Sequence, residues 1–365
     1  MTYFSRTRRT AAEALRLRGW ALRRLLTGAE EELPAASALA WRAFLRSERC
    51  ALLLQESLGE STSKLPSDCA RELRDTAMRE TVWILSARAQ LHTIADIAAA
   101  HDIRVVALKG TAAVARGRNV QVTDVDVLAT PADASKLARL LDATGFTRGP
   151  RDGPWHLAER MLSGAVNVEV HVAVSGFDSP ETVRWHDVRA IDGMEPLEVL
   201  APHDHAWTVL CQATRKHPDR RTRLRDLYLV NRALSESTVD ERAALEARVL
   251  EDTYRRELSD MLVRATNVDQ VEPATQRTLR RLYLLRARDL GVGSGTKTGR
   301  LWQMAVEVVA AGAVQDWERK QQLRDGSGVP RWTVRRFLFG APLALIATVI
   351  GRVVSYDAFL LERRT

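Results

Sequence analysis

The chain has 365 residues, of which 45% are hydrophobic and 27% are charged, and its formal net charge is +8. The hydrophobic fraction is ordinary for a globular protein and excludes wholesale disorder. Cys50, Cys69 and Cys211 are scattered, with neither metal-ligand spacing nor a disulfide pattern, so we expect a reducing cytoplasm. The basic charge favours nucleotides, nucleic acids or anionic lipids as partners without distinguishing among them.

The first hundred residues are predicted to be helical. We expect two helices up to about residue 58, broken near Gly28 and Pro34, and a polar connector over residues 59–67. The first 26 residues are rich in arginine and lack a continuous apolar core, so they are no secretory signal. They are typical of a surface helix, although a transit peptide has the same composition. An unbroken helical pattern follows over residues 68–100, with apolar positions at Leu73, Ala77, Val82, Ile84, Leu85, Leu91, Ile94 and Ile97.

The next part of the chain alternates strand and helix patterns, which predicts a small α+β unit. An apolar run from Val105 leads into a short helix that ends near Arg116, and a helix is expected over residues 131–144 with Gly145 after its end. Beyond residue 196 the pattern is helical again, with Pro202 in the first turn. We therefore expect a helical region at 1–100, the α+β core at 101–195, a second helical region at 196–328 and an apolar tail at 329–365.

Two carboxylates are expected on one side of the strand that contains residues 124–128. Asp124 and Asp126 are two positions apart, and such residues of a strand face the same way. Like charges this close repel each other unless a cation or a hydrogen-bond network compensates them. A later alternating run places Glu169 and His171 on one face of another strand. The pattern indicates a cation site, and the alternative is a solvated pair of acids on an edge strand.

A turn with the sequence Lys109-Gly110-Thr111 precedes the acidic strand. Gly110 would let a phosphate approach the backbone, Thr111 would offer a hydroxyl and an amide at a helix start, and Lys109 would add a positive charge. These three residues are therefore candidates for binding a nucleotide. The alternative is an ordinary turn between a strand and a helix.

Three short motifs resemble, in order and type, the bacterial uncharacterised nucleotidyltransferase family of the polymerase-β-like nucleotidyltransferase superfamily. They are Leu108-Lys109-Gly110, Asp124-Val125-Asp126-Val127-Leu128 and Glu169-Val170-His171. A weaker match runs from His217 to Arg225-Asp226-Leu227, and the resemblance covers about residues 80–235. Relatives commonly carry an arginine a few residues before the Asp pair, whereas Arg118 of this chain lies nearer the preceding helix.

The resemblance implies a polymerase-β-like core and a Mg²⁺-dependent enzyme that moves a nucleoside monophosphate, first of all AMP from ATP, to a hydroxyl or phosphate acceptor. Asp124, Asp126 and Glu169 would be catalytic and would hold two ions, and the helical region at 196–328 would bind substrate and nucleotide. His171 would orient a phosphate, act as a base or be a structural histidine. Asp226 would either accept a proton from the acceptor or pair with neighbouring arginines.

The acceptor class stays open among a small molecule, a tRNA and a protein. The rival interpretation is a non-catalytic protein that keeps the nucleotidyltransferase fold and docks on a membrane or a biosynthetic complex. Residues 337–351 are an uncharged run of fifteen residues that contains Pro342 and is short of the roughly 20 needed to span a bilayer. We expect this run to be a buried hairpin or docking helix, with a peripheral membrane contact as the alternative.

Overall fold

The computed structural model describes residues 3–149, 158–162, 166–174, 177, 188–216 and 223–268. Nearly all of them belong to one unit, made of residues 1–214 and 219–287. His217 and the apolar tail at 329–365 lie outside the described residues. No helix within the described ranges is long and apolar enough to cross a bilayer.

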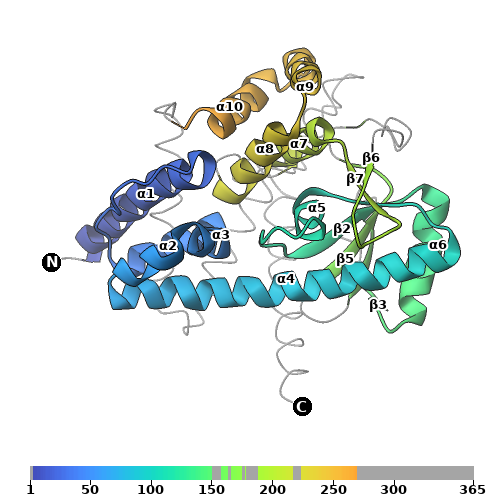
Figure 1. The fold of residues 1–365 in the computed structure, drawn as a ribbon, viewed down its shortest axis with the longest axis horizontal. Helices are drawn as coiled ribbons and strands as arrows, with labels where there is room; N and C mark the ends of the chain where they lie inside the picture. The colour runs from blue at the N-terminus through green and yellow to red at the C-terminus, as the bar shows by residue number, and fades with distance from the viewer. Residues whose placement is uncertain are drawn as a thin grey trace, which may run out of the picture. The chain divides into compact units, whose positions relative to one another are not determined.

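Helices come first along the chain (Figure 1). They are α1 Tyr3–Thr27, α2 Ala38–Glu48, α3 Ala51–Leu58, the 3₁₀ helix η1 Gly59–Lys64 and α4 Ser67–His101. The prediction of two helices before residue 58 is wrong, because the second one is divided. Arg49 has a left-handed backbone with a φ of 53° and ends α2. The expected long helix is confirmed as α4.

A carboxylate of α4 explains why a separate helix begins after Arg49. Glu80 accepts hydrogen bonds from the backbone N–H of Ala51 at 3.1 Å and of Leu52 at 2.8 Å, and so satisfies two groups of the first turn of α3. Burial raises the pKa of Glu80 to about 7, although these hydrogen bonds act against the shift. The cap is therefore a group whose charge changes near neutral pH.

We predict that Glu80 makes the protein less stable as the pH rises. A carboxyl whose pKa is about 7 in the folded state and 4.5 in the unfolded chain holds its proton more tightly when folded. The contribution of this group to the free energy of unfolding, roughly 3 kcal/mol, is present below pH 4.5 and is lost as the pH rises to about 7. Urea denaturation between pH 4.5 and 8 should show this loss in wild type and in the exposed control Glu60→Gln, but not in Glu80→Gln. Equal pH dependence in all three proteins would contradict the assignment.

A mixed sheet forms the second half of the described fold. Its strands are β1 Val105–Ala107, β2 Asp124–Leu128, β3 Thr147–Arg148, β4 Ala158–Leu162, β5 Asn167–His171, β6 Val188–Ala190 and β7 Leu197–Leu200. They are ordered β3-β4-β5-β2-β1-β7-β6. β2 runs parallel to β5 and antiparallel to β1, and β1 runs parallel to β7. The predicted α+β class is confirmed.

One strand replaces an expected helix. The sequence predicts that residues 197–200 begin the helical region, but they form β7, which pairs with β1. Leu197, Val199 and Leu200 are all buried there. A four-residue apolar segment has no periodicity long enough to distinguish strand from helix, and pairing with β1 decides the outcome.

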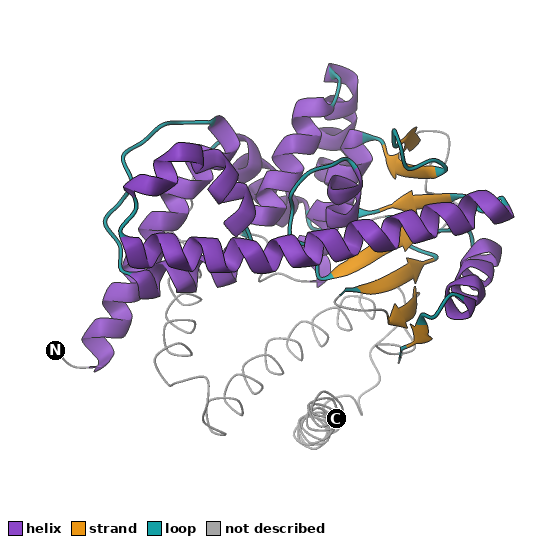
Figure 2. Ribbon diagram, turned by 60° about the horizontal axis from the view of Figure 1, so that its bottom comes forward, coloured by secondary structure: helices purple, strands orange, loops and turns teal. Residues whose placement is uncertain are grey.

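Further helices follow along the chain. They are α5 Lys109–Ala115, α6 Pro131–Ala143, α7 Pro202–Cys211, the π-helical turn η4 Gln212–Lys216, α8 Leu224–Glu236, α9 Val239–Glu251 and α10 Arg255–Thr266. Among them, α5, α6 and α7 are the ones that pack on the strands (Figure 2). One core joins α4 and α6 to the valines of the central strands, among them Val125, Val127, Val168 and Val170. Because side chains alternate along a strand, the acidic residues between these valines belong to the other face of the sheet.

Candidate active site

The predicted acidic side chains meet because β2 and β5 are neighbours. In the parallel register Asp126 lies beside Glu169, Asp124 beside Asn167, and Leu128 beside His171. The valines between them face the core, so the two aspartates, Glu169 and His171 share the opposite face. Two segments that are distant in sequence thus bring three acids and one imidazole together.

Asp126, Glu169 and His171 form a buried cluster. One ligand atom from each lies within 4.8 Å of the others. His171 Nε2 is 2.7 Å from Asp126 Oδ1 and 3.6 Å from Glu169 Oε2. Asp124 is not part of this tight group of described residues, but it lines the adjoining pocket together with Asp126. Carboxylate oxygens with one imidazole are a donor set that binds divalent cations.

Two basic side chains neutralise the acids of the cluster. Lys109 Nζ is 3.1 Å from Asp126 Oδ1. Arg160 of β4 donates to Glu169 Oε1 from Nη2 at 2.7 Å and from Nε at 3.1 Å. Arg160 is not among the residues that the sequence identifies. The signal that points to it is the antiparallel pairing of β4 with β5, which puts Arg160 directly opposite Glu169.

The two aspartates of β2 differ in their affinity for a proton. Burial raises the pKa of Asp124, and the charge of Asp126 raises it further. Burial would also raise the pKa of Asp126, but Lys109 and the hydrogen bond with His171 outweigh it and lower that pKa. Asp126 therefore loses its proton more readily than Asp124 and is the carboxylate better prepared to bind a cation.

The first turn of α5 is held against β2. Lys109 has a φ of 51°, a left-handed backbone conformation that is strained for a residue with a side chain. The Thr111 hydroxyl accepts a hydrogen bond from the backbone N–H of Asp126 at 2.9 Å and lies 3.5 Å from the carbonyl oxygen of Asp124. Thr111 thereby fixes the start of α5 to the strand that carries the two aspartates.

We predict that Gly110→Ala destabilises the protein by about 1–3 kcal/mol, since a Cβ at this position would lie 2.9 Å from Cγ1 of the buried Val122. The matched control is Gly19→Ala in α1, where the nearest atom would be 3.9 Å away. It should stabilise the protein slightly, because alanine is the better helix former. Chemical denaturation measures the free energy of unfolding of both variants. Equal changes would contradict the prediction that a side chain at position 110 is destabilising because of its contact with Val122.

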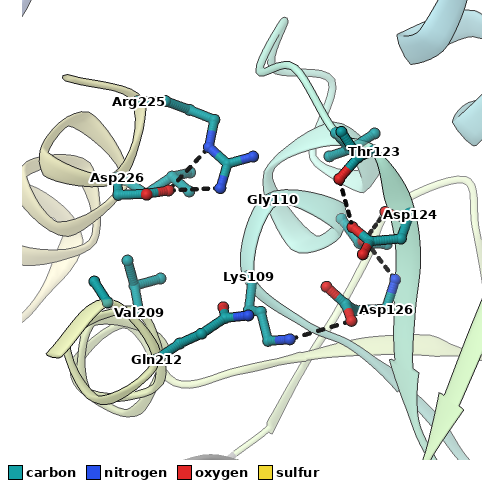
Figure 3. A pocket seen from close by; sticks show the side chains of 13 residues that line it. Lys109, Gly110, Thr123, Asp124, Asp126, Val209, Gln212, Arg225 and Asp226 are labelled. Carbon is teal, nitrogen blue, oxygen red and sulfur yellow. Dashed lines mark hydrogen bonds and ion pairs between the residues drawn. The ribbon is translucent and has the colours of Figure 1, made fainter. Parts of the chain in front are cut away.

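The acids of β2 open onto a pocket of about 500 Å³, which includes space open to solvent. Figure 3 shows Asp124 and Asp126 on one side, facing Arg225 and Asp226 of α8 on the other. The lining residues come from α5, β2, α7, η4 and α8 and the segment before β2: Lys109, Gly110, Thr111, Val122, Thr123, Asp124, Asp126, Val209, Gln212, Ala213, Arg225, Asp226 and Leu229.

Arg225 and Asp226 form the second charged wall of the pocket. Arg225 donates to Asp226 Oδ1 from Nε at 2.9 Å and from Nη2 at 2.6 Å. Its Nη1 donates to the carbonyl oxygen of Gln121 at 3.1 Å. Asp226 is thus brought to the site and paired with a neighbouring arginine. Arg225 itself was not among the predicted site residues, although it precedes Asp226 in the same motif.

A family model described as uncharacterised nucleotidyltransferase matches residues 37–268, more than half of the chain. The match includes the sheet, the acidic cluster and both walls of the pocket. No curated protein and no solved structure matches this chain.

Proposed function

This chain belongs to the uncharacterised nucleotidyltransferase family, and on that premise we propose that it transfers a nucleoside monophosphate, first of all AMP from ATP, to a hydroxyl or phosphate acceptor with Mg²⁺. The membership confirms the resemblance and the enzyme class that the motifs indicate. The observation that carries the proposal is the convergence of Asp124, Asp126 and Glu169 on one sheet face, beside the turn that begins at Lys109.

The acidic residues fit a hard divalent cation. The ligand atoms of Asp126, Glu169 and His171 are already within 4.8 Å of one another. Asp124 lies close enough to Asp126 for the charge of Asp126 to raise the pKa of Asp124. We propose that Asp124 and Asp126 share two ions and that Glu169 holds one of them. When bound, Mg²⁺ would neutralise phosphate charge and stabilise the attacking and leaving oxygens.

The first turn of α5 would bind the triphosphate. Lys109 lines the same pocket as the two aspartates, so its ammonium group is placed to bind a phosphate oxygen. Gly110 lines the same pocket and would let a phosphate approach the backbone there. Thr111 already uses its hydroxyl to hold β2, so its proposed part is to keep this turn beside the aspartates. The proposed role of His171 is to hold the carboxylate of Asp126 in position through the hydrogen bond of its Nε2.

Arg225 would bind the triphosphate from the opposite wall. Its hydrogen bonds to Asp226 and Gln121 use three of its five N–H groups, and two are left to donate to an anion. Its guanidinium contacts the backbone three residues before Asp124, in the segment where relatives commonly carry their arginine. Arg225 would therefore replace that arginine from another element. The proposed role of Asp226 is to orient Arg225. Its alternative role is to accept a proton from the acceptor.

The test is a transfer assay with two labels. Purified protein, Mg²⁺ and a cell extract are incubated with ATP labelled at the α-phosphate or at the γ-phosphate. The proposal predicts that the α-label enters an acceptor, that the γ-label leaves in pyrophosphate, and that EDTA stops both. Transfer of the γ-label instead would make the protein a phosphotransferase. ATP binding without Mg²⁺ and without transfer would favour the non-catalytic alternative. The acceptor, the cytoplasmic location and the membrane contact of the tail stay predictions.

A further inference from the structure

One face of α4 is apolar but does not pack in the described fold. The buried side of this helix joins the core through residues such as Ile84, Leu91 and Ile94. In contrast, Met78, Val82 and Leu85 are 71%, 54% and 56% exposed, and the exposed Ala89 continues their row. In Figure 1, α1, α2 and α3 lie on one side of the N-terminal half of α4.

The exposed row has the spacing of a helix-pairing seam. Its four apolar residues follow one another at intervals of four, three and four, the alternation that places side chains on one stripe of a helix in a coiled coil. The same alternation continues through exposed charged and polar residues at both ends. The complete row, here called the α4 stripe, is Arg71, Asp75, Met78, Val82, Leu85, Ala89, His92 and Asp96.

The order of charges along the α4 stripe is complementary to itself when reversed. A second α4 that runs antiparallel, with its centre between residues 83 and 84, places Arg71 opposite the second copy's Asp96 and Asp75 opposite its His92. The large Met78 then lies opposite the small Ala89, and Val82 lies opposite Leu85. The side chains of these four outer residues make no hydrogen bond or ion pair with another residue that the structure describes.

Other occupants fit the charges less well. A parallel second copy would place Arg71 opposite Arg71 and Asp96 opposite Asp96, and like charges that face each other are destabilising. An anionic lipid surface would meet the carboxylates of Asp75 and Asp96. An antiparallel copy instead pairs opposite charges twice, because a two-fold axis repeats each contact.

We propose that the α4 stripe is an interface between two copies of this chain, packed antiparallel around a two-fold axis. The proposal is independent of the transfer reaction, since it rests on α4 and not on the pocket. The first test is the mass of the full-length chain in solution by sedimentation and light scattering. Wild type should be a concentration-dependent dimer, and a monomer at the highest concentration reached would overturn the proposal.

Leu85→Glu tests the apolar centre of the stripe. Each dimer would then bury two unpaired carboxylates, so Kd should rise at least about a hundredfold. Because Leu85 is exposed, the monomer should fold as wild type does, which circular dichroism checks. The matched control is Leu250→Glu on α9, at a position that is 65% exposed and lies off the stripe. A dimer that survives Leu85→Glu would place the interface elsewhere and overturn the proposal.

Charge exchange tests the antiparallel arrangement. Arg71→Asp or Asp96→Arg alone turns two attractive pairs of the dimer into repulsive ones, so each Kd should rise about tenfold. The double variant should recover the wild-type Kd. A mixture of the two single variants should form the heterodimer, in which both pairs attract. If neither the double variant nor the mixture recovers, the stripe is not paired with an antiparallel copy and the proposal fails.

Discussion

Asp126→Asn should reduce nucleotidyl transfer by about 10²- to 10³-fold or more. Asp126 is the carboxylate whose pKa is lowered, and it contacts Lys109 and His171 at the centre of the cluster. Asparagine keeps its shape but removes the negative charge that a hard cation requires. The measurement is the initial rate at which the α-label of ATP enters acceptor, at saturating Mg²⁺.

Two controls separate lost chemistry from lost folding. Asp142→Asn makes the same chemical change at an exposed position of α6 and should keep the full rate. Thermal unfolding should show that Asp126→Asn is folded at the assay temperature. Titration with Mn²⁺ should show binding to wild type and to Asp142→Asn but not to Asp126→Asn. A folded Asp126→Asn protein with more than about a tenth of the wild-type rate would contradict the catalytic assignment.

Arg225→Lys should weaken the binding of MgATP by about 10- to 100-fold while binding of adenosine changes little. Lysine keeps a positive charge beside Asp226 but lacks the planar set of N–H groups that holds Asp226, Gln121 and an anion together. The measurement is calorimetric titration with both ligands. The quantity that matters is the ratio of the two dissociation constants.

The ratio distinguishes recognition of phosphate from support of the fold. Arg104→Lys is the matched control, because Arg104 forms an exposed ion pair with Glu198 and does not line the pocket. It should leave both dissociation constants unchanged. If Arg225→Lys weakens ATP and adenosine equally, Arg225 supports the pocket without contacting phosphate. If wild type binds no MgATP, the proposed function fails before the part of Arg225 is tested.

Local patterns are sufficient to predict the strands that carry the acids. Alternating valines and acids define β2 and β5, because each strand buries one face and leaves the other polar. Which strands lie next to one another depends on tertiary pairing. The two motifs alone therefore do not predict that Arg160 of β4 lies opposite Glu169. The position of Arg225 in the site is not predicted for a related reason. Its guanidinium is held there by the carbonyl oxygen of Gln121, which is 104 residues away in sequence.

The helical regions show the limits of periodicity. The apolar pattern of α4 is correct as a helix signal, yet it includes Val82 and Leu85, which lie on the exposed side. A helix with two apolar faces gives the same pattern as one with a broad buried face. The break at Arg49 also has no glycine or proline to mark it, and it depends on Glu80, a residue of another helix.

The most direct test of the central claim is a crystal structure with Mn²⁺ and a non-hydrolysable ATP analogue, read by the anomalous scattering of the metal. The claim predicts manganese bound by Asp124, Asp126 and Glu169, with the triphosphate between Lys109 and Arg225. Nucleotide bound elsewhere, or in this pocket with no metal at these three carboxylates, would contradict it.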